Sequence, residues 1–210
     1  DGYRLVWADE FNVDGPLNPH DWSFENGFVR NGEAQWYQPD TARCTRGHLI
    51  IEARRETRPN PIYSPTSKTW PTNQRDLTYT SASVNTRGKH QWLYGRFEMR
   101  ARIDTRPGSW PAFWTLGAKG GWPACGEIDI MEYYRQMLLA NIAWAQTGGT
   151  NHSVWNSVRT PMTSFPADWA TKFHTWRMDW DAASIKLYCD GRLLNSQDLA
   201  KTVNPDGDNP

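Results

Sequence analysis

The chain has 210 residues, with 23 Lys plus Arg and 23 Asp plus Glu, so its formal net charge at pH 7 is zero. This balance provides no overall field that would attract nucleic acid or an anionic membrane, and we expect neither as a partner. No apolar stretch is as long as a membrane-spanning helix. The length suits one large domain, and we expect residues 1–210 to form a single domain.

Aromatic residues are the strongest signal in the composition. The chain contains thirteen Trp, eight Tyr and seven Phe. Their flat faces suit flat apolar partners, of which the C–H faces of sugar rings are one kind. The ordinary alternative is that Trp fills a core, and we expect about half of these side chains to do so.

Cysteine and histidine give little support to other kinds of site. The three cysteines, Cys44, Cys125 and Cys189, are too few for a disulfide framework, although one bridge is possible. No cluster of Cys and His has the spacing of a zinc site, and no glycine-rich motif predicts a phosphate-binding loop. We therefore predict no metal ligands and no required cofactor.

The first clear alternation of apolar and polar residues lies at 48–54 (HLIIEAR), which places Leu49, Ile51 and Ala53 on one face. This period of two predicts a half-buried strand. Residues 56–78 follow with four prolines and little periodicity. A segment of that length inside a compact domain is typical of a functional surface loop.

Alternation returns later in the chain. Residues 96–103 (RFEMRARI) and 174–180 (HTWRMDW) predict two strands with one apolar face each. Residues 184–194 alternate around Asp190-Gly191, which predicts a two-residue hairpin. No segment keeps a helical period, and residues 204–210 (NPDGDNP) have the composition of a turn. We therefore predict an all-β sandwich or jelly roll with antiparallel sheets.

Residues 126–134 (GEIDIMEYY) contain three acids in an otherwise buried-looking strand. Because side chains alternate between faces, Glu127 and Asp129 share one face, while Glu132 has the parity of the core. An unpaired buried carboxylate is costly. A β-bulge near Ile130-Met131 would return Glu132 to the acidic face, and such bulges are common beside active sites.

The spacing of these acids suits a pair of catalytic carboxylates. With the bulge, the Cα atoms of Glu127 and Glu132 are roughly 13 Å apart. Inward-leaning side chains would bring the carboxyl groups to about 5 Å, the separation found in retaining glycosidases. Like charges at that distance separate the two pKa values, so that one group stays an acid and the other a nucleophile. The alternatives are a solvated acidic strand and a cation site built from three carboxylates.

The segment 122–134 (WPACGEIDIMEYY) resembles the active-site segment of glycoside hydrolase family 16, especially of its laminarinase-like members. Residues 7–12 resemble the opening strand of that family, and residues 31–37 resemble its Asn-containing substrate loop. The resemblance continues in order through residues 94–103, 109–117 and 173–191.

The resemblance implies a concanavalin-like β-jelly roll of two antiparallel sheets with a concave substrate cleft. By position, it implies that Glu127 is the nucleophile, that Glu132 is the general acid/base, and that Asp129 tunes the pair. It further implies that sugars stack on Trp110, Trp114 and Trp122 and that Asn31 hydrogen-bonds one. For these four residues, core Trp and turn Asn are the ordinary alternatives.

The sequence departs from the family pattern at three places. Residues 81–83 read Ser-Ala-Ser where the pattern has Ser-Ala-Arg, and Arg87 is the candidate substitute for the missing arginine. Trp144 stands where many family members have His. Family members continue beyond the equivalent of residues 204–210 into further strands, so we expect an incomplete C-terminal end and a doubtful structural calcium site.

The leading hypothesis is endo-acting, configuration-retaining hydrolysis of β-1,3 or mixed-linkage β-1,3/1,4-glucan by a secreted, periplasmic or cell-surface enzyme. A second hypothesis keeps the chemistry and changes the substrate to a galactan such as agarose, porphyran or carrageenan. A third is a non-catalytic carbohydrate-binding sandwich, and a fourth is transglycosylation through the same glycosyl-enzyme intermediate.

Overall fold

The computed structural model describes residues 2–146 and 152–202, so the predicted turn at 204–210 lies outside the described residues. The chain divides into two compact units. We call Arg4–Gln91 the N-terminal unit, and we call Asp1–Tyr3 together with Trp92–Pro210 the sandwich unit. That residues 1–210 form one domain stays a prediction.

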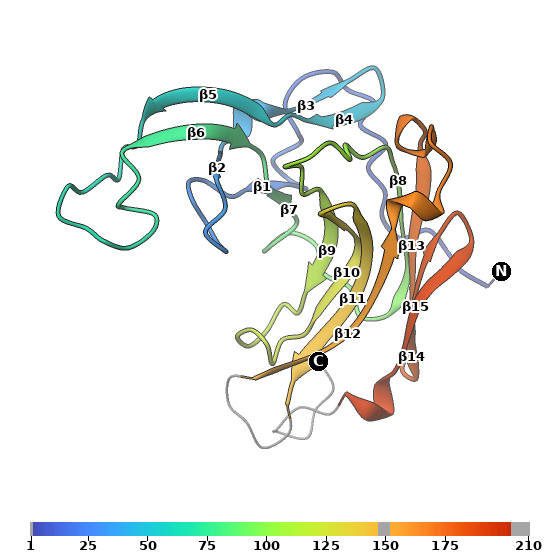
Figure 1. Cartoon of the computed structure of the whole chain (residues 1–210). Helices are drawn as coiled ribbons and strands as arrows, with labels where there is room; N and C mark the ends of the chain where they lie inside the picture. Colours follow the sequence, from blue (N-terminus) through green and yellow to red (C-terminus); the bar gives the residue numbers. More distant parts are fainter. Residues whose placement is uncertain (1, 147–151, 203–210) are drawn as a thin grey trace. The chain divides into compact units, whose positions relative to one another are not determined.

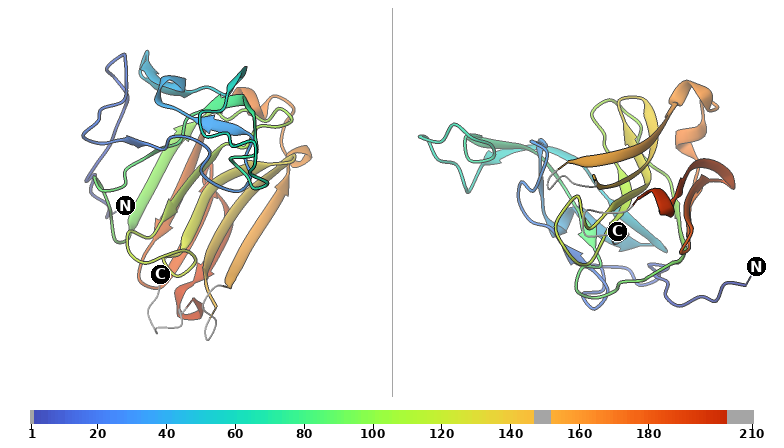
Figure 2. Two further views of the ribbon diagram at one scale, coloured as in Figure 1. Left: turned by 90° about the vertical axis from the view of Figure 1, so that its left-hand side faces the viewer. Right: turned by 90° about the horizontal axis from the view of Figure 1, so that it is seen from below.

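The sandwich unit contains two four-stranded antiparallel sheets (Figures 1 and 2). The first has the strand order β12-β11-β10-β9 and the second β15-β14-β13-β8. The strands are β8 (Gly95–Ala101), β9 (Ala112–Leu116), β10 (Glu127–Tyr134), β11 (Met137–Ala145), β12 (Ser153–Pro161), β13 (His174–Trp180), β14 (Ser184–Cys189) and β15 (Arg192–Asp198).

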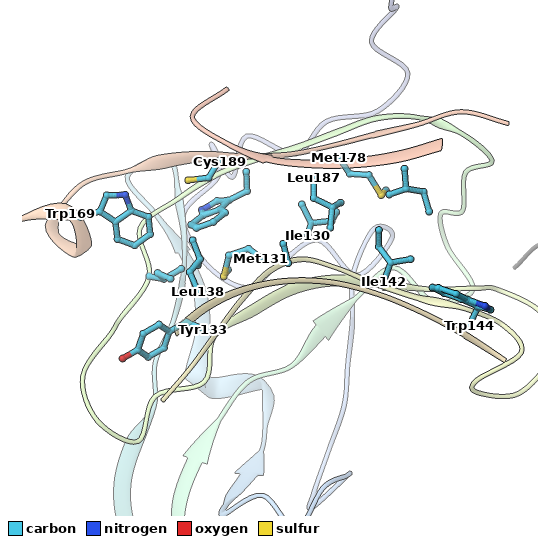
Figure 3. Close-up of a cluster of buried hydrophobic side chains, with 14 of the residues drawn as sticks. Ile130, Met131, Tyr133, Leu138, Ile142, Trp144, Trp169, Met178, Leu187 and Cys189 are labelled. Carbon is cyan, nitrogen blue, oxygen red and sulfur yellow. The ribbon is translucent and has the colours of Figure 1, made fainter. Parts of the chain in front are cut away.

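The core of this unit lies between the two sheets, as Figure 3 shows for its labelled side chains. Trp176 and Met178 of β13 are fully buried there, and Phe97 and Met99 of β8 pack against the same cluster. The apolar faces predicted for 96–103 and 174–180 are therefore confirmed. Burial of such faces from both sheets is the main favourable term for a sandwich.

The hairpin between β14 and β15 is also confirmed. Cys189 pairs with Arg192, which leaves Asp190 and Gly191 as a two-residue loop. Their φ angles are +49° and +78°. Both positions of this kind of turn need positive φ, which Asp and Gly adopt at low cost.

The N-terminal unit has a smaller core and three small sheets, of order β1-β7, β3-β4 and β2-β6-β5. Its strands are β1 (Ser23–Phe24), β2 (Gln35–Tyr37), β3 (Ala42–Thr45), β4 (His48–Ile51), β5 (Arg54–Pro59), β6 (Asp76–Ser81) and β7 (Val84–Asn85). The pairing of β2 with β6 is parallel, which differs from the expected antiparallel pattern. The long connection through β3, β4 and β5 makes such a parallel pair possible.

Three sequence predictions in this unit are wrong in detail. Residues 7–12 form no strand, because Asp9 accepts a hydrogen bond from the backbone N–H of Phe11, whose φ is +53°. The strand predicted over 48–54 ends at Ile51, which is exposed, and the backbone N–H of Glu52 donates instead to Thr41. The segment 56–78 is loop only between β5 and β6, since both of its ends belong to these strands.

Helical structure is minor in the described part of the chain. It consists of four 3-10 turns of three residues each, η1 (Pro39–Thr41), η2 (Met162–Ser164), η3 (Trp169–Thr171) and η4 (Leu199–Lys201). None of the described helices has the length and hydropathy needed to cross a membrane. All three cysteines are free, so the one possible disulfide does not form.

Candidate active site

A β-bulge in β10 places its acids on one face. The pairing register shifts between Asp129 and Met131 against β9, and between Asp129 and Glu132 against β11. Ile130 and Met131, the two residues inside the shift, are both buried in the core. The predicted bulge is therefore confirmed, and Glu132 does not enter the core.

The three carboxylates belong to one hydrogen-bonded cluster. The amide nitrogen of Asn141, on β11, donates to Oδ2 of Asp129 at 2.9 Å and to Oε2 of Glu132 at 2.8 Å. Because one nitrogen reaches both groups, Asp129 and Glu132 lie within two hydrogen-bond lengths, about 6 Å, of each other. Asp129 is also hydrogen-bonded to Glu127. The separation of about 5 Å between Glu127 and Glu132 stays a prediction.

Burial strongly changes the titration of Asp129. Only 5% of its surface is exposed. Burial, together with the charges of Glu127 and Glu132, raises its pKa to about 8, and the Asn141 hydrogen bond opposes this rise. Asp129 is therefore protonated at neutral pH and can donate its hydrogen bond to the carboxylate of Glu127.

This raised pKa makes stability depend on pH. In the unfolded chain Asp129 loses its proton near its ordinary pKa of 3.8, whereas in the folded protein it keeps the proton up to about 8. Between these values the folded state binds more protons, so this group lowers stability as pH rises. We expect Asp129→Asn to stabilise the fold by a few kcal/mol at pH 8, since one pKa unit is worth about 1.4 kcal/mol. The gain should vanish below pH 4, as measured by urea unfolding at pH 4, 6 and 8.

Asp181 offers a matched control, because its pKa is lowered by folding whereas that of Asp129 is raised. Hydrogen bonds from the backbone N–H groups of Ala183 and Ser184 lower its pKa. Its contribution is present above its ordinary pKa and is lost as pH falls, so Asp181→Asn should cost stability at pH 8. If Asp129→Asn were less stable than the wild-type protein at pH 8, and more so than at pH 4, the protonated state assigned to Asp129 would be wrong.

Two exposed tryptophans hold the outer carboxylates. The indole N–H of Trp122 donates to Oε2 of Glu127, and that of Trp110 donates to Oε1 of Glu132, each at 2.6 Å. Trp122 is 50% exposed and Trp110 is 42% exposed, so ring surface remains open beside the carboxylates. Their role in stacking sugar stays a prediction. The two hydrogen bonds give these indoles a second role, which is to orient the carboxylates.

The other two predicted binding residues lie in different places. Trp114, on β9, pairs directly with Asp129 across the strands and is half-buried, which puts it on the face of the acids. Asn31 lies in a turn of the N-terminal unit with φ +58°, and its amide donates to Glu33. Both assignments as substrate-binding residues stay predictions.

Two residues at the site were missed from the sequence. Asn141 is 4% exposed, and its signal was a single polar residue inside the apolar run LLANIAWA. Trp155, on β12, is 42% exposed, with its ring centroid 6.5 Å from that of Trp122. Trp155 pairs with Ala143 on β11, and Ala143 pairs with Glu127 on β10. Only the small side chain of Ala143 therefore lies between Trp155 and Glu127. Strand register, which alternation alone does not give, was needed to find it.

Trp144, the second departure from the family pattern, does not face the acids. It lies in the core of the sandwich unit and has the opposite parity to Asn141 on β11.

Gly117 fixes the loop that carries Trp122. A Cβ atom at Gly117 would lie 2.0 Å from the backbone oxygen of Cys125. Gly117→Ala must therefore displace residues 121–126, and we expect it to lower kcat/KM by roughly 10²-fold, the effect of about 1 Å of misplacement. Gly121→Ala is the control, because its Cβ would meet no atom within 4 Å. Equal kcat/KM values for the two variants would contradict this prediction.

The hydrogen-bond pattern argues against a cation among the acids. The N–H₂ group of Asn141 lies between Asp129 and Glu132, where a cation would need oxygen ligands. Elsewhere in the described residues, ligand atoms of His174, Cys189 and Asp190 lie within 4.8 Å of one another. Both ring nitrogens of His174 are already hydrogen-bonded, and burial raises the pKa of Cys189 to about 12. Because both ring nitrogens of His174 are already used in hydrogen bonds, we assign no metal site.

A β-sandwich with two orienting indoles and three clustered carboxylates on one sheet face has the parts of a retaining glycoside hydrolase. The sequence profile of glycosyl hydrolases family 16 matches residues 34–206. The chain is 33% identical to a beta-glucanase of Rhodothermus marinus, over 98% of this chain and 69% of that protein. It is 34% identical to a glucan endo-1,3-beta-glucosidase of Cryptopygus antarcticus, over 94% of this chain and 70% of that protein.

A solved structure from work on endo-acting O-glycanases of the human gut microbiota superposes with a TM-score of 0.85. It is 33% identical and covers 96% of this chain and 73% of that one. This chain therefore belongs to glycoside hydrolase family 16, and it is a glycoside hydrolase with the jelly-roll fold of that family.

Proposed function

We propose that this protein cleaves β-1,3 or mixed-linkage β-1,3/1,4-glucan internally and with retention of configuration. The observation that carries the proposal is the placement of Glu127, Asp129 and Glu132 in one hydrogen-bonded cluster beside exposed tryptophans. Family membership and the two glucanase relatives support the choice of a β-glucan.

In the first step, the Glu127 carboxylate attacks the anomeric carbon and the bond to the leaving sugar breaks. Glu132 gives its proton to the leaving glycosidic oxygen, which departs as a hydroxyl group. In the second step, Glu132 takes a proton from water, and the resulting hydroxide attacks the anomeric carbon and releases Glu127. The proton on Asp129 keeps one negative charge, rather than two, beside the attacked carbon.

A purely binding sandwich would not need this arrangement. Burying Asp129 and interrupting β10 with a bulge both cost stability, and neither feature is needed to bind a sugar. A hydrolase needs both, because they place the carboxyl groups that react. Transglycosylation would use the same intermediate with a sugar in place of water. Retained binding of glucan without any product would favour the binding module, and longer oligosaccharide products would favour transfer.

Products from a panel of polysaccharides test the proposal. Laminarin, lichenan and agarose, with keratan sulfate and mucin O-glycans added, should be digested side by side and followed by reducing ends and by proton NMR. We expect mixed-length oligosaccharides from laminarin or lichenan, with the β-anomer appearing first. Digestion of neither glucan would reject the proposal.

A galactose-containing glycan is the second candidate substrate. The observation in its favour is that the chain is 28% identical to a keratan-sulfate endo-1,4-beta-galactosidase of Sphingobacterium multivorum, over 91% of this chain and 42% of that protein. Products from agarose, keratan sulfate or mucin O-glycans, with none from laminarin or lichenan, would select this candidate.

Polysaccharides do not cross membranes unaided, so we propose that the protein works in a secreted, periplasmic or cell-surface form. Neither general acid nor nucleophilic catalysis by carboxyl groups needs a cofactor. We therefore propose that turnover needs no added cofactor or calcium, and undiminished turnover after treatment with a chelator would support this.

A further inference from the structure

The N-terminal unit contains a hollow of about 150 Å³ that the proposed chemistry does not use. Two segments that are distant in sequence form it, the turn before β2 and the loop between β5 and β6 together with the start of β6. Its lining is Phe28, Gly32, Glu33, Ala34, Trp70, Gln74, Asp76 and Thr78. We propose that this hollow, which we call the Trp70 pocket, binds an uncharged hexopyranose unit of a polysaccharide chain.

The pocket has an aromatic wall. The rings of Trp70 and Phe28 meet at 60°, with centroids 5.8 Å apart, and Phe28 in turn meets Trp36 at 80° and 5.5 Å. These edge-to-face contacts fix the orientation of the indole. A half-buried indole held in this way offers a rigid flat surface, which suits the C–H face of a sugar ring.

The loop that carries Trp70 is held in place by Asn60, which is 5% exposed. The amide of Asn60 donates to the backbone oxygens of Pro71 and Gln74, at 3.2 and 2.7 Å. Its backbone N–H donates to the oxygen of Arg75 at 3.0 Å. The wall of the pocket is therefore fixed before a ligand arrives, which lowers the entropy cost of binding.

The rim of the pocket is polar and carries negative charge. Asp76 and Thr78 project from one face of β6, because Leu77 between them is buried on the other. The parallel pairing of β2 with β6 brings Glu33 beside them. Among the described residues, the Asp76 carboxylate makes no hydrogen bond or ion pair, so its oxygens are available to accept from sugar hydroxyls.

The charges select the class of sugar. The lining has two carboxylates and no cationic side chain. Sulfate or uronate groups would meet repulsion there, whereas neutral hydroxyl groups would find acceptors. The pocket therefore fits a neutral glucan rather than a sulfated galactan. This inference deepens the proposed function, and it rests on that function only for the identity of the polymer.

The test measures binding in the Glu127→Gln background, so that no ligand is consumed. The probe is a β-1,3-linked glucose hexasaccharide, titrated by calorimetry and by the indole N–H signal of Trp70, which Trp70→Phe identifies. We expect Trp70→Ala to weaken binding about tenfold, as loss of one aromatic contact does. Asp76→Ala should weaken it several-fold without disturbing the fold, because its side chain has no described hydrogen-bond partner.

Tyr63→Ala is the matched control, because Tyr63 is a 40% exposed aromatic residue on the same loop but outside the lining. Its affinity should equal that of the parent. Unchanged affinity in both Trp70→Ala and Asp76→Ala, or tighter binding of a sulfated galactan hexasaccharide, would overturn the proposal. Failure of the wild-type protein to cleave any glucan would reject the proposed function alone, because the binding measurement does not use turnover.

Discussion

Glu127→Gln is expected to lower kcat by at least about 10⁴-fold on every polysaccharide that the wild-type protein cleaves. The amide cannot form the glycosyl-enzyme bond, and it no longer accepts a full ionic hydrogen bond from Trp122. Glu132→Gln should cost roughly 10²- to 10⁴-fold, the usual worth of a positioned general acid. Turnover would be measured from reducing ends on the polysaccharide that the wild-type protein cleaves fastest.

The two variants should differ in how they respond to a change of substrate and nucleophile. An aryl glycoside with a good leaving group needs little protonation, so Glu132→Gln should recover much of the first step, and added azide should then give a product of retained configuration. Glu127→Gln should show no such recovery. Glu98→Gln is the control, since Glu98 is an exposed acid on β8 of the other sheet. Wild-type turnover in either Glu127→Gln or Glu132→Gln would reject the assigned roles.

The fold of the sandwich unit could be predicted because its strands follow their local pattern. At 174–180 His174 and three apolar residues alternate with polar ones, and the structure buries His174, Trp176 and Met178 on that face. The hairpin at Asp190-Gly191 was readable because this turn accepts few residue types. The bulge in β10 was predictable for a different reason: an unpaired carboxylate in a core costs too much to occur.

The N-terminal unit was less predictable because long-range contacts, rather than local patterns, determine its structure. Residues 7–12 resemble the opening strand of the family, but the hydrogen bonds of Asp9 with Phe11 and Trp22 hold them in another conformation. The parallel partner of β2 lies 44 positions further along the chain, since Gln35 pairs with Tyr79. Alternation of apolar and polar residues predicts a strand, but it does not predict which distant strand will pair with it.

Only the part of the site that lies in one segment could be predicted, for a similar reason. Glu127, Asp129 and Glu132 stand in one segment, whereas Asn141 and Trp155 come from neighbouring strands. The position of Asn141 and Trp155 beside the acids depends on strand register, which a sequence pattern specifies only loosely when both faces of a strand are apolar. β11 is such a strand, with eight of its nine residues buried.

Asn141→Leu is expected to separate activity from stability. Oδ1 of Asn141 is buried and has no hydrogen-bond partner among the described residues, which by itself costs about 1–3 kcal/mol. Leu has a similar volume and removes that cost, while it also removes the donor shared by Asp129 and Glu132. These two effects oppose each other, so we expect the free energy of unfolding to change by no more than about 1 kcal/mol. In contrast, kcat should fall about 10²-fold, because both carboxyl groups lose the group that positions them.

The pH profile distinguishes positioning from general damage. The Asn141 hydrogen bond favours the ionised form of Asp129, so its loss should raise the pKa of Asp129 further and move the alkaline limb of kcat to higher pH. Asn195→Leu is the matched control, because this buried amide donates only to the backbone oxygens of Ala140 and Asn156. That variant should lose stability, by about 1–3 kcal/mol for the carbonyls left without a donor, and keep the wild-type pH profile. If Asn141→Leu behaved as Asn195→Leu does, Asn141 would be a structural residue only, and the unpaired oxygen would have no functional explanation.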